Sequence, residues 1–172
     1  MEGFEKKDYK VFEMFSRDWA LATAGDAENF NTCTIGWGSL GSIWHRPGGV
    51  MPIVTVYVNP ARYTWEFLNK YEYFTVSFFG EEHREALKYL GSHSGRDGDK
   101  VAAAGLTPKA VLGGKAVTFN EAELTFVCRM LYRAPFERKG MAEDIDKGVY
   151  KDWEPHWMYV GEIVETEDKR EE

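Results

Sequence analysis

The feature that most constrains the fold is a series of strand-like segments with only short helical segments between them. Short apolar runs, and runs rich in β-branched and aromatic side chains, are typical of strands when they are bounded by glycine, proline or polar clusters. Such runs occur at 17–24, 31–37, 53–58, 72–79, 115–119, 121–132 and 156–165. The series argues against a doubly wound parallel sheet, because long crossover helices are missing. It favours a mainly β fold, namely an antiparallel barrel with helices added.

The stretches between these runs predict loops and short helices. Residues 38–52 contain glycines and prolines at several positions, so this stretch is predicted to be a loop. Asn59-Pro60 predicts the start of a helix, since Asn caps free backbone donors and Pro is tolerated at the first helical position. Residues 81–90 predict an amphipathic helix that stops at Gly91.

Two further stretches lie later in the chain. Residues 97–104 predict a short helix that ends at Gly105, with Asp97 as its cap. Residues 134–154 mix charged residues with Gly and Pro, and their length favours a binding flap or a dimer arm over a domain boundary.

Bulk properties narrow the class of protein. The length of 172 residues fits one domain over 1–172. With 21 basic and 28 acidic residues the net charge is −7, which disfavours a nucleic-acid partner. Cys33 and Cys128 are far apart and form no CxxC pair, so reduced thiols in a cytosol fit best. No apolar run approaches the ~20 residues of a membrane span, and no signal peptide is recognised, so we expect a soluble, cytoplasmic protein.

Two well-known patterns do not predict a site. Gly36, Gly38 and Gly41 match the dinucleotide motif GxGxxG, but no helix follows to receive a pyrophosphate. The four histidines show neither HxxxH nor HExxH spacing, so no metal site is predicted.

A more informative pattern is Arg62 and Thr64 directly after the strand at 53–58. A guanidinium fork, a hydroxyl and the free N–H groups of a helix start together suit a single phosphate. The alternative is that Arg62 pairs with Glu66 four residues later, although that order is the less favourable one. The residues alone favour neither interpretation.

A second cluster, residues 92–100, is dense in hydroxyls, cations and glycines. It could supply further donors to an anion. General loop chemistry favours the other interpretation, a solvated loop that caps the following helix. The high aromatic content of 15% suggests rings that line a site for a flat ligand or a subunit interface, or else a ring-rich core.

Several blocks together resemble the flavin reductase-like, FMN-binding split-barrel family, close to its flavoredoxin branch. The matching blocks are residues 31–41 (NTCTIGWGSLG), 60–67 (PARYTWEF), 73–79 (YFTVSFF), 92–100 (SHSGRDGDK) and 156–163 (HWMYVGEI). They follow the order of the family and cover nearly the whole chain. The resemblance implies a six-stranded antiparallel Greek-key split barrel, a homodimer, and FMN bound near the subunit interface.

The resemblance also implies the site residues. Asn31, Thr32, Cys33 and Thr34 would run beside the flavin ring, with their backbone groups on its polar edge and Trp37 nearby. Arg62 and Thr64 would hold the phosphate, and Ser94, Arg96 and Lys100 would close over it. His156 would lie near the same pocket. Cys33 stands where Met or Ala is more usual in such proteins, which leaves its role open.

Two functions follow from the resemblance. The first is an oxidoreductase that takes electrons from NADH or NADPH and passes them to flavin or onward to an acceptor. The second is an electron carrier of the flavoredoxin type, which exchanges electrons with a redox protein partner without oxidising a nicotinamide directly. In either case the flavin carries the electron chemistry and the protein positions it, so no catalytic acid or base is predicted.

Overall fold

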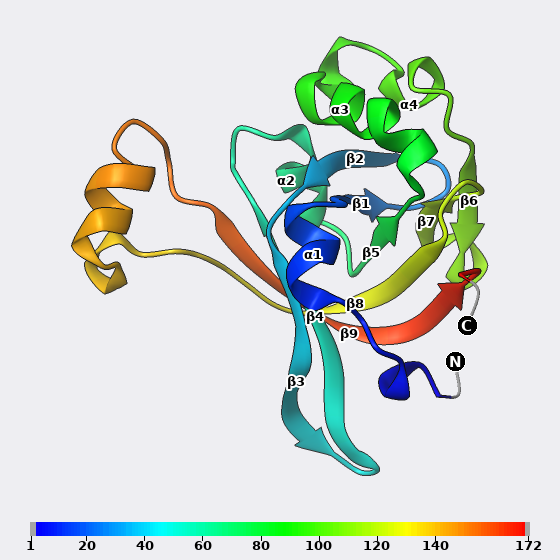
Figure 1. Cartoon of the computed structure of the whole chain (residues 1–172), viewed down its shortest axis with the longest axis horizontal. Helices are drawn as coiled ribbons and strands as arrows, with labels where there is room; N and C mark the ends of the chain where they lie inside the picture. Colours follow the sequence, from blue (N-terminus) through cyan, green and yellow to red (C-terminus); the bar gives the residue numbers. More distant parts are fainter. Residues whose placement is uncertain (1–2, 171–172) are drawn as a thin grey trace.

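The computed structural model describes residues 3–170, and its main feature is one antiparallel sheet of seven strands (Figure 1). The strand order is β2-β1-β5-β8-β9-β4-β3. The bounds are β1 Ala20–Gly25, β2 Phe30–Ile35, β3 Gly38–Arg46, β4 Gly49–Val58, β5 Tyr73–Phe78, β8 Leu124–Pro135 and β9 Trp157–Asp168. A small second sheet pairs β6 (Pro108–Val111) with β7 (Ala116–Phe119).

The helices are short. The α-helices are α1 Val11–Ser16, α2 Tyr63–Leu68, α3 Arg84–Ser92 and α4 Lys100–Ala103. Single 3-10 turns are η1 Phe4–Lys6, η2 Glu81–His83, η3 Gly95–Asp97, η4 Leu112–Gly114 and η5 Arg138–Gly140, and η6 Ile145–Val149 is a π-helix. In Figure 1, α3 and α4 lie together over the end of the barrel at β2.

The sheet curls so that β2, at one of its edges, comes against β4. No backbone ladder joins these two strands anywhere in residues 3–170. The barrel of six strands therefore has one open seam, between β2 and β4. The expected mainly β split-barrel class is confirmed, and β3 adds a seventh strand outside the six because it forms a long hairpin with β4.

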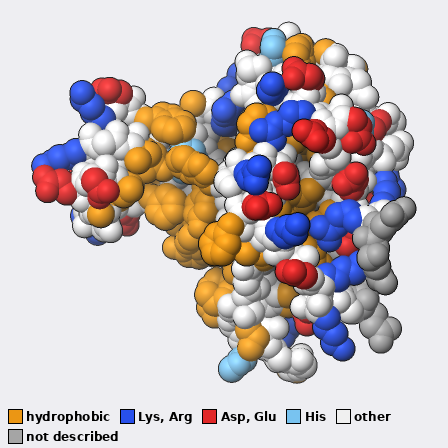
Figure 2. Space-filling view, in the orientation of Figure 1, with side chains coloured by type: hydrophobic (Ala, Val, Ile, Leu, Met, Phe, Trp, Pro, Cys, Tyr) orange, Lys and Arg blue, Asp and Glu red, His pale blue; other side chains and the backbone are white. Residues whose placement is uncertain are grey.

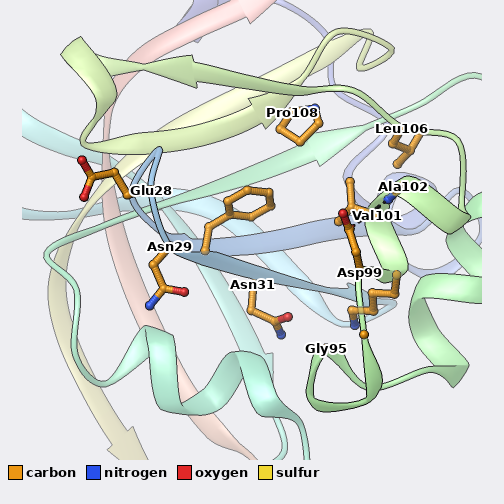
Figure 3. Close-up of a pocket in the computed structure, with 12 residues that line it drawn as sticks. Glu28, Asn29, Asn31, Gly95, Asp99, Val101, Ala102, Leu106 and Pro108 are labelled. Carbon is orange, nitrogen blue, oxygen red and sulfur yellow. Dashed lines mark hydrogen bonds between the residues drawn. The ribbon is translucent and has the colours of Figure 1, made fainter.

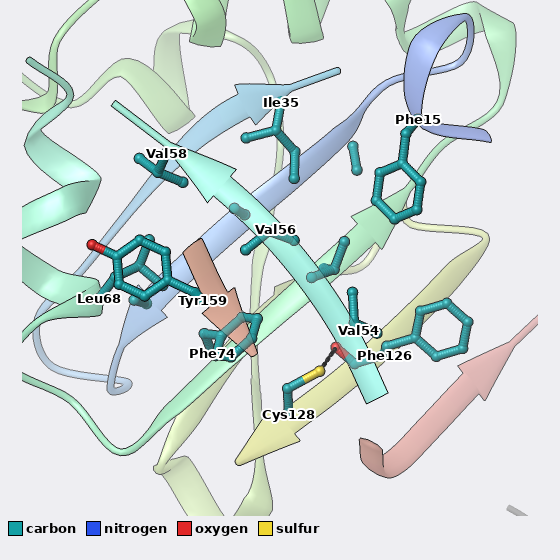
Figure 4. Packing of buried hydrophobic residues seen from close by; sticks show 14 of the residues in the cluster. Phe15, Ile35, Val54, Val56, Val58, Leu68, Phe74, Phe126, Cys128 and Tyr159 are labelled. Carbon is teal, nitrogen blue, oxygen red and sulfur yellow. Dashed lines mark hydrogen bonds between the residues drawn. The ribbon is translucent and has the colours of Figure 1, made fainter. Parts of the chain in front are cut away.

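Apolar side chains fill the barrel (Figure 4). Val54 and Val56 of β4 face Phe74 of β5 and Tyr159 of β9, and all four are completely buried. A second apolar cluster lies between the outside of the sheet and the helices, where Leu87 and Leu90 of α3 are buried. Burial of these two leucines fixes α3 against the sheet.

The loop predicted for residues 38–52 is wrong. The chain there forms β3 and most of β4, paired from Gly38↔Val56 to Arg46↔Gly49. Its glycines serve the hairpin: Gly48 and Gly49 have φ of 104° and 128° at the turn, a backbone region that favours glycine. A Cβ at Gly38 would overlap the ring of Phe15 in α1.

Three helix boundaries also differ from the prediction. Asn59 Oδ1 accepts from the N–H of Ala61 at 3.0 Å and so caps a turn, while α2 begins only at Tyr63. Helix α3 continues through Gly91 to Ser92.

The cap of α4 is Asp99, because its Oδ1 accepts from Ala102 N–H at 3.1 Å, and not Asp97 as predicted. The first strand starts at Ala20, later than the predicted 17.

Residues 136–156, which join β8 to β9 and are called the arm below, project from the barrel, at the left in Figure 1. Arg138 holds the arm in shape: its guanidinium donates to Asp146 Oδ1 at 2.7 Å, to the carbonyl of Tyr150 at 3.0 Å and to that of Trp153 at 3.1 Å. Asn59 Nδ2 ties the arm to the end of β4 through the carbonyl of Glu154, at 2.7 Å.

Candidate functional site

A cleft of about 240 Å³ lies at the open seam of the barrel. One wall is the end of β2 and the Gly36-Trp37 link; the other is the end of β4. The complete lining is Cys33, Thr34, Ile35, Gly36, Trp37, Tyr57, Val58, Asn59, Arg62, Trp153 and His156. Because β9 pairs Trp157 with Val58 of β4, His156 lies at the same end of the barrel.

Successive side chains of β2 point in opposite directions. Asn31 and Cys33 are buried on one face, where Asn31 Nδ2 donates to Thr64 Oγ1 of α2 at 2.8 Å. Thr32 Oγ1 lies 2.8 Å from Thr23 Oγ1 of β1, and Thr34 Oγ1 donates to the carbonyl of Leu87 in α3 at 2.5 Å. The side chains of Asn31, Thr32 and Thr34 therefore already have hydrogen-bond partners within the protein.

The main chain of β2 has one free edge. The strand pairs with β1 on one side, and its other side faces the seam. An edge strand presents a row of N–H and C=O groups that have no ladder partner. This row can bond to the polar rim of a flat ligand held in the cleft.

Arg62 and Thr64 lie at the start of α2, beside the cleft. The Arg62 guanidinium donates to the carbonyl of Gly91 in α3, and the hydroxyl of Thr64 is buried against Asn31. Glu66 pairs with Arg96 at 2.7 Å, so the Arg62–Glu66 alternative is not what this structure shows. Arg62 is left as a cation that lines the cleft.

The loop after α3 brings Ser94 and Arg96 next to α2. Ser94 Oγ accepts from the N–H of Arg96 at 3.2 Å, and the Arg96 guanidinium lies 4.5 Å from the centre of the Tyr63 ring. The loop packs tightly here, because a Cβ at Gly95 would overlap Asn31 Oδ1.

Lys100 is almost completely buried. Its ammonium donates to the carbonyls of Leu90 at 3.1 Å and His93 at 3.0 Å. It lines, together with Asn31 and Gly95, a second pocket of about 340 Å³ (Figure 3). Lys100 thus supports the loop through these two carbonyls, and its positive charge lowers the pKa of the Cys33 thiol, against the larger effect of burial.

Burial, with smaller contributions from nearby charges, shifts the pKa values of three residues at the site. Burial raises the pKa of the Cys33 thiol, against the smaller opposing effects of a Thr64 hydrogen bond and of the Lys100 and Arg62 charges. Burial lowers the pKa of Lys100, and Arg62 lowers it further. Burial also lowers the pKa of His156 to about 4, with a smaller contribution from Arg62. His156 is therefore neutral at physiological pH, and Cys33 is a thiol.

Five of the eleven predicted site residues line the cleft: Cys33, Thr34, Trp37, Arg62 and His156. The hydrogen-bonded pair Asn31 and Thr64 lies behind it, and Thr32, Ser94, Arg96 and Lys100 do not line it. Sequence reasoning missed Tyr57, Asn59 as a cleft residue, and Trp153. Asn59-Pro60 predicts only a helix start, and the high aromatic content is the sole signal for the two rings.

The chain matches the family model described as the flavin reductase like domain over residues 12–172. The chain belongs to this family. The match spans the barrel, the cleft and the arm of this flavin reductase-like protein. Comparison with curated protein sequences finds no match.

Solved structures support the fold. A flavoredoxin from Methanosarcina acetivorans is similar with a TM-score of 0.67 and 21% identity, over 94% of this chain and 73% of that one. An FMN-binding protein from Thermus thermophilus, with bound 1-cyclohex-2-enone, gives 0.67 and 20%, over 95% and 80%. An NADH:FAD oxidoreductase from Streptomyces globisporus, in complex with NAD and FAD fragments, gives 0.61 and 15%, over 88% and 75%.

Within residues 3–170 no helix is long and apolar enough to cross a membrane. In the same range no group of three or more His, Cys, Asp or Glu side chains could hold a metal ion.

Proposed function

We propose that this flavin reductase-like domain, a single domain over 1–172, binds FMN at the seam and acts as an oxidoreductase with NADH or NADPH as electron donor. The observation that carries the proposal is the cleft itself, where an unpaired strand edge, aromatic rings and the Arg62 cation meet. A flat ring with a polar rim and a phosphate needs these three groups. The donor set therefore fits FMN.

The residues divide by role. The backbone of Asn31, Thr32, Cys33 and Thr34 would bond to the polar rim of the ring, and Trp37 and His156 would form its aromatic wall. Arg62 would hold the phosphate, with Thr64 beside it. Ser94, Arg96 and Lys100 would shape the loop that covers the phosphate end of the ligand. A flavin, once bound, supplies the hydride and electron transfer, so the chain needs to orient it and tune its potential.

A flavoredoxin-type carrier is the second candidate. It is favoured by the similarity to a flavoredoxin, whereas the similarity to an NADH:FAD oxidoreductase favours direct use of a nicotinamide. In the carrier role a redox protein would dock over the cleft and exchange electrons with the flavin.

A homodimer is part of the proposal. The cleft of about 240 Å³ is smaller than the roughly 300–1,000 Å³ usual for ligand pockets, which supports a second subunit that would complete its wall. Apolar side chains are exposed on and near the arm, at Tyr132, Phe136, Ile145, Val149 and Trp153, and orange atoms mark the neck of the arm in Figure 2. Such a surface fits a subunit contact. A cytoplasmic location is consistent with the two unpaired cysteines.

The test is an absorbance spectrum of the purified protein before and after anaerobic NADH or NADPH. Flavin bands that are bleached by one nicotinamide support the reductase and give its donor. Bands that persist until dithionite is added favour the carrier. A protein that neither carries nor takes up FMN contradicts both.

A further inference from the structure

His156 is enclosed by three aromatic rings. The ring centroid of Trp37 lies 4.5 Å from that of the imidazole, that of Trp153 lies 4.7 Å away at 82°, and that of Tyr150 lies 5.8 Å away. Trp37 comes from the link after β2, and the other two come from the arm. The imidazole is 7% exposed, so its orientation is set by this enclosure.

One ring nitrogen of His156 is occupied. Its Nδ1 lies 2.9 Å from the hydroxyl of Tyr150, which is 4% exposed. The carbonyl of Tyr150 is held in turn by Arg138 at 3.0 Å. The arm therefore places the phenol, and Nε2 is the ring nitrogen left to meet a ligand in the cleft.

The direction of this hydrogen bond follows from counting protons. A neutral imidazole carries one N–H, and a phenol always carries one O–H. If Nδ1 donated, the buried Tyr150 hydrogen would need a second acceptor, and none is found within residues 3–170. If the phenol donates, its hydrogen is bonded to Nδ1 and the imidazole proton lies on Nε2, on a residue that lines the open cleft, where water or a ligand can accept it. An unsatisfied buried donor costs about 1–3 kcal/mol, so the second arrangement is favoured.

We propose that Tyr150 is a positioning residue that fixes His156 as the Nε2–H tautomer, so that the cleft presents a neutral hydrogen-bond donor to a carbonyl oxygen or ring nitrogen of the bound flavin. The role of the donor toward flavin rests on the proposed function. The tautomer itself is a property of this chain.

The first experiment reads the tautomer by NMR of the histidine ring nitrogens, in the full-length protein as purified and after removal of any flavin. His156→Gln identifies the His156 signals by their loss. We expect a protonated Nε2 and an unprotonated, hydrogen-bonded Nδ1 in the wild type, and shifts averaged between tautomers in Tyr150→Phe. Tyr132→Phe removes an exposed phenol and serves as the control, with the wild-type pattern retained. A wild-type Nδ1–H pattern, or no change in Tyr150→Phe, overturns the proposal.

The second experiment measures FMN affinity. A glutamine amide can place its N–H near the position of Nε2, so His156→Gln should stay within about threefold of the wild type, while His156→Leu and Tyr150→Phe should weaken binding about fivefold to tenfold. Equal losses in the Gln and Leu variants would contradict a donor at Nε2. Absence of FMN binding by the wild type would contradict the proposed function and leave the NMR result on the tautomer readable.

Discussion

Asn31 of β2 donates from its side-chain amide to Thr64 Oγ1 of α2 over 2.8 Å, and both side chains are buried. We expect Asn31→Ala and Thr64→Val each to lower the free energy of unfolding by about 1–3 kcal/mol, because each leaves a buried polar partner unpaired. The double variant should lose less than the sum. Urea unfolding of the four proteins measures this. Ser16→Ala, which removes an exposed hydroxyl, is the control. Strictly additive losses would show that the two groups are not coupled.

Arg62 is predicted to recognise the phosphate. Arg62→Ala should weaken FMN binding by about 10–100-fold, since hydrogen bonds to charged groups contribute about 1.5–3 kcal/mol, and should change riboflavin binding little. Titration calorimetry with both ligands checks this. Arg17→Ala, at an exposed arginine outside the cleft, is the matched control. Equal losses for FMN and riboflavin would refute the assignment.

Gly95 packs directly on Asn31, and an added Cβ would overlap Asn31 Oδ1 and approach the Tyr63 ring. Gly95→Ala should therefore push the 94–99 loop outward and destabilise the protein by about 1–3 kcal/mol. The midpoint temperature of thermal unfolding and the affinity for FMN should both decrease. Gly140→Ala, where a Cβ meets nothing within 4 Å, should leave both unchanged. If the two variants behave alike, the close contact is not important.

His156 makes the stability depend on pH. Its pKa is about 4 in the folded protein and about 6.5 when unfolded, so the unfolded state binds more protons between these values. Stability is therefore complete above about pH 6.5 and decreases as the pH falls toward about 4. From about pH 7 to about pH 5 we expect a loss of about 2 kcal/mol from this group alone. Urea unfolding of the wild type and His156→Gln measures it as the difference between their pH profiles; identical profiles would contradict it.

The two thiols are predicted to be unreactive in the folded protein. Cys33 and Cys128 are both 2% exposed or less, and burial raises both pKa values, so little thiolate is present or accessible. A thiol reagent such as DTNB should react with both only after unfolding. If one thiol reacts in the native protein and that reaction is lost in Cys33→Ala, Cys33 is a reactive group of the cleft.

The strands with a clear apolar pattern could be predicted from the sequence, and β3 could not. Ile53–Val58 is a run of β-branched and aromatic residues and lies in β4. In β3 most side chains are exposed, and small residues such as Gly38, Ser39 and Gly41 give no alternation of apolar and polar side chains. Glycines at a hairpin turn and under the Phe15 ring look the same in a sequence as glycines of a loop.

The site could be predicted in part because its motifs lie in order along the chain. Motifs cannot show which partner within the protein a side chain binds. Arg96 pairs with Glu66, Lys100 donates to two carbonyls, and Thr34 donates to a carbonyl of α3. The roles of Tyr150 and Trp153 depend on how the arm turns to bring both rings against His156 and on how His156 meets Trp37 of a distant segment, which no local pattern records.

The open seam between β2 and β4 has a thermodynamic consequence. Because no backbone hydrogen bonds join β2 to β4 in the described part of the chain, the barrel is held together most weakly at the seam. A molecule that bonds to both strands would link them. Occupancy and stability are then linked: a ligand at 100 times its dissociation constant adds about 2.7 kcal/mol to the free energy of unfolding. Substitutions far from the cleft that loosen the barrel would cost ligand affinity, and abundant ligand would mask them.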